Sequence, residues 1–169
     1  MSKAIVLYTS HSGNTEKVAM KIAEGLETEY RNNRKIPNLT DYDLIVIGGW
    51  VMFGRISFSS ARFLKKLRRK NISGKKIALF FTAGDPDEIN PFTERSGNPK
   101  TIKQIMFETM EKMISEKQQV TFLTERFYCK GAVKMFKNSE PSVSVGHPTP
   151  EDLTQAKSFG EQLKNLLKK

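Results

Sequence analysis

The sequence predicts a doubly wound α/β fold, in which helices cover both faces of a parallel sheet. Two observations lead to this prediction. Short apolar runs of strand length alternate with segments of helical periodicity, and no internal repeat or low-complexity tract interrupts them. The chain has 169 residues and 38% apolar content, so we expect one domain with its own core over residues 1–169.

The strands are expected where apolar residues run together. They are residues 3–9, 44–47, 76–82 and 119–127. A doubly wound sheet also requires a strand near Arg34 to Pro37. Pro37 and the charges beside it allow only a short edge strand there.

The helices are expected where apolar residues recur three and four positions apart. They are residues 14–28, 57–70 and 100–116, and a last helix that begins at Pro150. Proline is common at the first position of a helix, because its missing N–H would have no partner there. Residues 84–99 and 130–149 are expected to form long loops, which in compact domains are often functional.

A loop rich in neutral hydrogen-bond donors joins the first strand to the first helix. The candidate binding residues in it are Ser10, His11, Ser12, Gly13, Asn14 and Thr15. Gly13 permits a tight turn, and the helix that follows points the positive end of its dipole at the loop. The loop contains no lysine or arginine, so neutral donors and the dipole would bind a phosphate. The alternative is an ordinary turn that caps a helix.

Residues 9–15 read T-S-H-S-G-N-T and resemble the phosphate loop of flavodoxins, T/S-x-T-G-N-T. Ser12 replaces the usual threonine and keeps a hydroxyl, and His11 fills the variable position. The resemblance implies a flavodoxin-like fold with a five-stranded parallel sheet in the order 2-1-3-4-5. It also implies FMN as the cofactor, at the switch between the first and third strands.

The resemblance extends to a segment after the second apolar strand. The residues concerned are Trp50, Val51, Met52, Phe53 and Gly54. Glycines let a backbone approach a flat ring, and Trp50 and Phe53 are the candidates to stack on it. The run D-Y-D-L-I-V-I-G-G-x-x-x-x-G is more similar to the menaquinone-dependent protoporphyrinogen oxidase branch, which implies that Phe53 is the stacking residue. The alternative for Trp50 is core filling.

A third segment ends the next strand. In the family it wraps the edge of the flavin, and its members here are Thr82, Ala83, Gly84 and Asp85. Hydrogen bonds from such a loop set the flavin's potentials. A plain turn is the alternative.

Charge is distributed unevenly along the chain. The net charge is +10, and residues 55–76 contain nine Lys or Arg and no Asp or Glu. Wound as a helix, Arg62, Lys65, Lys66 and Arg69 share one face. We expect this face to bind an acidic redox protein or an anionic membrane surface. A solvated face without a partner is the alternative, and nucleic acid is disfavoured because no aromatic residues interleave the charges.

No nucleophile, base and acid occur at a telling spacing, so no catalytic residue is assigned and the chemistry belongs to the flavin. The function we expect is FMN-dependent electron transfer of the flavodoxin type. The alternatives are an FMN oxidoreductase acting on a quinone or porphyrinogen, and a flavin-free anion- or nucleic-acid-binding domain.

The single cysteine, Cys129, favours a reducing cytoplasm, and a quinone-linked role would place the protein at the membrane periphery. One cysteine and two histidines argue against a thiolate and imidazole metal site. The sequence does not indicate an oligomeric state.

Overall fold

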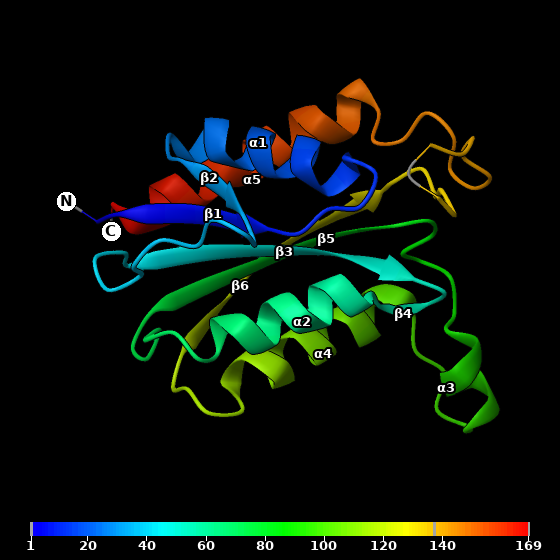
Figure 1. Ribbon diagram of the computed structural model, residues 1–169, viewed down its shortest axis with the longest axis horizontal. Coiled ribbons are helices and arrows are strands. Elements are labelled where there is room, and N and C mark those ends of the chain that lie inside the picture. The colour runs from blue at the N-terminus through cyan, green and yellow to red at the C-terminus, as the bar shows by residue number, and fades with distance from the viewer. Residues whose placement is uncertain (1, 137, 169) are drawn as a thin grey trace.

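The computed structural model describes residues 2–136 and 138–168 and consists of three layers, with a sheet between two pairs of helices (Figure 1). The strands are β1 (Ala4–Tyr8), β2 (Tyr30–Asn32), β3 (Leu44–Met52), β4 (Arg55–Ile56), β5 (Lys76–Ala83) and β6 (Thr121–Lys130). The helices are α1 (Asn14–Leu26), α2 (Phe58–Leu67), α3 (Pro91–Arg95), α4 (Ile102–Ser115) and α5 (Pro150–Leu167).

The five main strands are parallel and lie in the order β2-β1-β3-β5-β6. The strand β4 is an addition that pairs antiparallel with the end of β3. When β4 is left out of the numbering, the observed order is 2-1-3-4-5, which confirms the predicted strand order. The order reverses between β1 and β3, and in such sheets ligands bind beyond the carboxyl ends of the strands at that point.

Both faces of the central strands β1, β3 and β5 are largely buried, which is why these strands are apolar almost without alternation. On one face Leu7, Ile47 and Leu79 pack with residues of α2 and α4. On the other face Val6 and Val46 pack with residues of α1 and α5. Figure 1 shows the two helix pairs on opposite sides of the sheet.

The edge strand was predicted in the wrong place. β2 occupies Tyr30–Asn32 and not residues 34–37, and it pairs with β1 through Val6, Leu7 and Tyr8. Tyr30 is fixed there by its ring, whose centroid lies 6.1 Å from that of Tyr8. Pro37 lies beyond the strand, in the connection to β3.

Other elements also differ from the prediction, among them β6, which was expected at residues 119–127 and occupies Thr121–Lys130. β3 continues through two glycines to Met52, because the hairpin with β4 supplies it with a partner. Helix α2 ends at Leu67, so that Arg69 lies in the turn after it. Residues 84–99 include the short helix α3, which the side chain of Asn90 caps. Within the described residues, no helix is long and apolar enough to cross a membrane.

Candidate functional site at the carboxyl edge of the sheet

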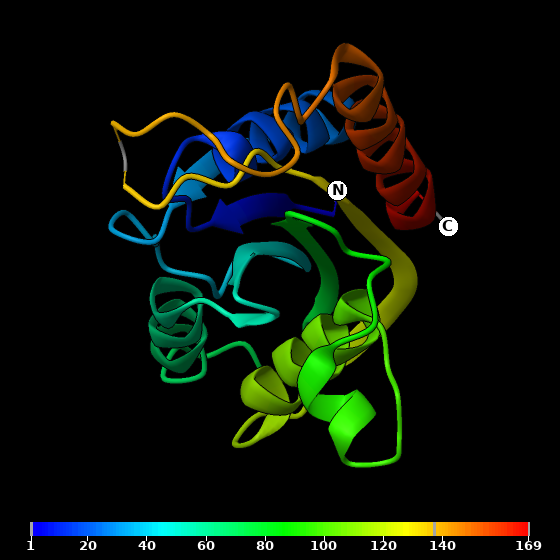
Figure 2. The same cartoon turned by 90° about the vertical axis from the view of Figure 1, so that its right-hand side faces the viewer.

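The carboxyl ends of β1, β3 and β5 meet at one edge of the sheet, which faces the viewer in Figure 2. Tyr8 at the end of β1 is paired with Gly48, and Trp50 in β3 is paired with Thr82 in β5. The three segments chosen from the sequence therefore come together. They are residues 10–15, 50–54 and 82–85.

The start of α1 is open to a ligand. Its N-cap, Gly13, has a left-handed φ of +94° and gives no side-chain cap, and a Cβ there would meet nothing within 4 Å. By contrast, side chains cap the four other helices of the described chain. No carbonyl or side chain of the described residues accepts from the backbone N–H groups of Asn14, Thr15 or Glu16. Donors of this kind, together with the helix dipole, are suited to binding an anion.

The side chains of Asn14 and Thr15 hold this loop in place. Thr15 Oγ1 lies 2.9 Å from Thr82 Oγ1 in the interior. Asn14 Nδ2 donates to Ser12 Oγ at 3.2 Å and to the carbonyl of Ala132 at 2.8 Å. Both predicted site residues thus connect the loop to other parts of the edge.

His11 and Trp50 bring the first two segments into contact. Their rings are stacked, with centroids 5.3 Å apart and planes inclined by 23°. Trp50 Nε1 donates to Ser59 Oγ at 3.0 Å, and Trp50 N–H donates to Ser60 Oγ at 3.0 Å. The indole is half-buried and fixed in orientation at the edge, whereas the imidazole is exposed.

The second segment is a β-hairpin and not the loop that the sequence suggested. Val51 and Met52 at the end of β3 pair with β4. The turn between the two strands consists of Phe53 and Gly54, whose φ values are +50° and +71°. Positive φ at both turn residues is typical of the type I′ hairpin. Phe53 projects from the turn into solvent.

The glycine pair in β3 has a packing role. A Cβ on Gly48 would lie 1.9 Å from Phe80 Cζ, so glycine is needed there to admit the Phe80 ring to the core. A Cβ on Gly49 would lie 2.9 Å from Ser60 Oγ. Gly48 is therefore required by the packing of Phe80, independently of any cofactor.

The third segment is covered by residues that sequence reasoning did not single out. Gly131 N–H donates to Ala83 O at 2.8 Å, and Ser144 Oγ donates to Gly84 O. Val133 and Val143 form an isolated antiparallel β-bridge. The side chain of Val133 lies against Gly84, where an added Cβ would be 2.9 Å from Val133 Cγ2. The only signal in the sequence was the length of the 130–149 connection.

Charge at this edge is mostly compensated locally. Asp85 lies 4.0 Å from Lys130. His147 Nδ1 lies 2.8 Å from Asp152 Oδ2, and Asp152 also accepts from Thr149 N–H in the capping box of α5. Burial opposes ionisation of Asp152, but the bonds from Thr149 and His147 outweigh it and hold the pKa of this carboxyl below its usual value.

The predicted basic residues lie on the surface, as expected. Arg62, Lys65, Lys66 and Arg69 are exposed. Among the described residues, none of the four forms an ion pair with a carboxylate. Lys66 Nζ instead donates to Asn33 O at 2.9 Å, which links α2 to the connection after β2.

Comparisons with known proteins agree with this architecture. The model of the flavodoxin domain family matches residues 5–161. The chain is 31% identical over 164 residues to the uncharacterized protein MJ0298 of Methanocaldococcus jannaschii, covering 95% of this chain and 97% of that one. It is 36% identical over 89 residues to the flavodoxin-like domain-containing protein BilS of Clostridioides difficile, covering 48% of this chain and 47% of that one. The solved structure of a flavodoxin from the domain Archaea superposes with a TM-score of 0.64 at 22% identity, with 99% of each chain covered.

Proposed function

The chain belongs to the flavodoxin domain family, and we propose that it works as an electron carrier whose FMN is bound by residues 10–15, 50–54 and 82–85. FMN is the cofactor that family membership assigns to this protein. When bound, FMN supplies a centre that takes up and releases one or two electrons. The protein's contribution is to bind and orient that group and to control what reaches it.

The observation that carries this proposal is the uncapped start of α1. A phosphate monoester is an anion with several acceptor oxygens, and the N–H groups of Asn14, Thr15 and Glu16 are donors that have no acceptor among the residues described by the structure. The hydroxyls of Ser10 and Ser12 lie in the same loop. The donor set thus fits a phosphate, and no lysine is needed in the loop because backbone N–H groups supply the positive charge.

Trp50 in β3 and Phe53 in the turn after β3 are the two aromatic residues that are candidates to stack on the ring of the cofactor. Trp50 is the better fixed of the two, since its indole N–H is bonded to Ser59 Oγ at 3.0 Å. Phe53 is the more accessible, at the tip of the hairpin. The backbone of residues 82–85 lies at the end of the adjacent strand, β5, where it is within reach of a ring held beside Trp50.

A carrier is favoured over an enzyme because the edge offers little acid or base chemistry. Within residues 2–136 and 138–168, the one contact between a histidine and a carboxylate is that of His147 with Asp152. Asp152 is engaged in capping α5, which fixes the pair as part of the fold. Because the described residues contain no other histidine–carboxylate pair, we assign the protein the task of holding the cofactor and setting its potential.

The test is a titration of the purified protein with FMN and with riboflavin, which lacks the phosphate, followed by reductive titration of the complex. We expect binding of one FMN, and much weaker binding of riboflavin because the loop loses its ligand. A protein that ignores added FMN would refute the proposal. Reoxidation by a small acidic redox protein but not by a soluble quinone would support the carrier over the oxidoreductase, and the reverse result would favour the enzyme.

A further inference from the structure

One side of the molecule combines uncompensated positive charge with large exposed apolar side chains. We call it the α2 face and define it by Arg34, Lys35, Phe58, Arg62, Lys65, Lys66, Arg69, Met135 and Phe136. Its members come from three places: the connection after β2, the helix α2 with the turn that follows it, and the connection after β6. We propose that this face binds the surface of an anionic phospholipid bilayer.

The basic residues of the α2 face come from two segments that are in contact. Lys66 Nζ donates to Asn33 O at 2.9 Å, which holds the connection that carries Arg34 and Lys35 against α2. Among the described residues, no carboxylate forms an ion pair with any of the six cations of this face. The nearby Arg68 differs, since it pairs with Glu116. The unpaired cations thus retain their full attraction for an external anionic surface.

The apolar members stand out from the surface. Phe58 is 86% exposed, Met135 71% and Phe136 69%. Phe58 is the first residue of α2, and the helical repeat places it in line with Arg62 and Lys65, while Arg69 lies in the turn that follows the helix. The stripe therefore runs from an aromatic side chain at the carboxyl edge of the sheet to positive charges at the other end of the helix.

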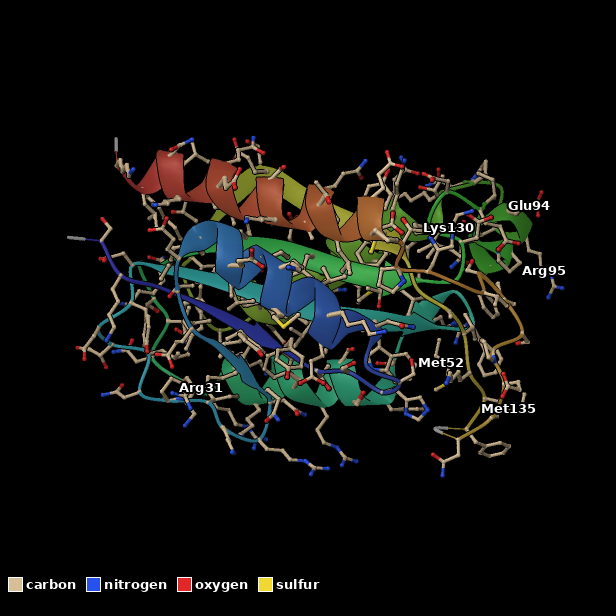
Figure 3. The ribbon with its side chains drawn as sticks, turned by 90° about the horizontal axis from the view of Figure 1, so that it is seen from above. Arg31, Met52, Glu94, Arg95, Lys130 and Met135 are labelled. Atoms are coloured by element: carbon tan, nitrogen blue, oxygen red, sulfur yellow. The ribbon has the colours of Figure 1, made fainter. Side chains whose placement is uncertain are left out.

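The two segments that carry these apolar residues lie on the same side of the molecule. In Figure 2 the tip of the connection after β6 and the helix α2 lie on the same side of the molecule, and Figure 3, which labels Met135, agrees. The connection after β6 and the start of α2 are separate projections, and such projections do not form a concave pocket for the side chains of a partner protein. Projecting aromatic and apolar side chains flanked by Lys and Arg are stabilised among lipid headgroups.

This geometry has a consequence for the site, which rests on the proposed function. Phe58 follows the hairpin of residues 51–56, and Met135 follows the residues that cover Gly84. Docking through the α2 face would thus bring the carboxyl edge, and with it the cofactor, close to the bilayer. Electron donors or acceptors dissolved in the membrane would then be within reach.

The experiment is cosedimentation of the FMN-loaded protein and of the flavin-free protein with phosphatidylcholine vesicles that contain or lack phosphatidylserine. We expect binding to the anionic vesicles only, weakened by added salt. Each Lys or Arg near such a surface contributes a factor of about 5. The double variant Lys65→Gln with Arg69→Gln should therefore bind roughly 25-fold more weakly.

Matched variants separate this proposal from a general effect of charge. Lys157→Gln with Lys164→Gln removes the same charge from α5, on the opposite side of the sheet, and should leave vesicle binding nearly unchanged. Phe58→Gln should weaken binding by about tenfold, whereas Phe92→Gln on α3 should not. The flavin spectrum of each variant reports cofactor binding separately, so loss of the flavin site is distinguishable from loss of lipid binding.

Three results would overturn the proposal. The first is equal binding to vesicles with and without phosphatidylserine, and the second is equal loss in the α2 and α5 double variants. The third is an α2 double variant that keeps its vesicle binding but reacts more slowly with an acidic redox protein. That result would assign the α2 face to a protein partner.

Discussion

Thr15 Oγ1 and Thr82 Oγ1 lie 2.9 Å apart and are buried, so that one hydrogen bond joins the first turn of α1 to the end of β5. The two residues are 67 positions apart in the chain, and in the sheet β3 separates β1, which precedes α1, from β5. The bond therefore fixes the phosphate loop relative to the segment that follows β5, and it determines the spacing of the two parts of the site.

The Thr82→Val variant tests this bond. Valine keeps the shape of threonine but leaves the Thr15 hydroxyl buried without a partner, which should lower the free energy of unfolding by about 1–3 kcal/mol. FMN affinity should fall as well, because the loop loses its anchor. Urea unfolding of the flavin-free protein and a fluorescence titration measure the two effects. The Thr82→Ser variant keeps the hydroxyl and should retain most of the stability and most of the FMN affinity. Equal losses in the Val and Ser variants would contradict the role of the bond.

The contact between Gly84 and Val133 gives a second prediction. A Cβ at position 84 would lie 2.9 Å from Val133 Cγ2, so Gly84→Ala should destabilise the protein by about 1–3 kcal/mol through overpacking. Val133→Ala removes the obstructing methyl group, and the double variant should recover much of the loss. Urea midpoints of the single and double variants measure this coupling. Strictly additive effects would show that residues 131–133 are not held against Gly84.

The stacking residue can be identified by comparing two exposed phenylalanines. If Phe53 lies on the flavin ring, Phe53→Ala should weaken FMN binding by roughly fivefold or more, the scale of an aromatic stacking contact. Phe92→Ala changes a half-exposed ring on α3 and should leave FMN affinity unaltered. The readout is the fluorescence of Trp50, the chain's one tryptophan, which bound FMN should quench. An unchanged affinity in Phe53→Ala would leave Trp50 as the stacking residue.

Cys129 should be chemically inert in the folded protein. Burial, with a smaller effect from the nearby Asp152 carboxylate, raises the pKa of its thiol to about 12. Because the raised pKa keeps the thiol neutral in the folded state, stability should decline as pH rises above the ordinary value near 8.5, where the unfolded chain ionises. Iodoacetamide should react slowly with the native protein at mildly alkaline pH and rapidly in urea. Fast alkylation of the native protein would show that the side chain is accessible.

The elements that the sequence predicted best are those whose signal is local. Helix α4 begins at Ile102 behind a capping box of Thr101 and Gln104, and the stripe of apolar residues in 100–116 was sufficient to predict it. β2 was misplaced because a three-residue edge strand has too few side chains to show a pattern. Its position depends on pairing with Val6, Leu7 and Tyr8 of β1, which no local signal reports.

The same distinction applies to the candidate site. The residues of the phosphate loop are contiguous, so their motif was visible in the sequence. The carbonyl of Ala132, which accepts from Asn14 Nδ2 at 2.8 Å, is 118 positions away and is a backbone group that carries no sequence signal. The packing role of Gly48 had no signal in the sequence, because the ring that it admits comes from another strand. That ring belongs to Phe80.

The sequence by itself determined the alternation of strands and helices, the phosphate loop and the positive charge of residues 55–76, because each depends on residues close together in the chain. Only the tertiary structure decided that α1 starts without a side-chain cap, that Thr15 meets Thr82, and that α2 lies on the same side of the molecule as Met135. These relationships arise when the sheet brings distant strand ends to one edge. The packing of the whole chain, and not any local preference, determines which groups meet there.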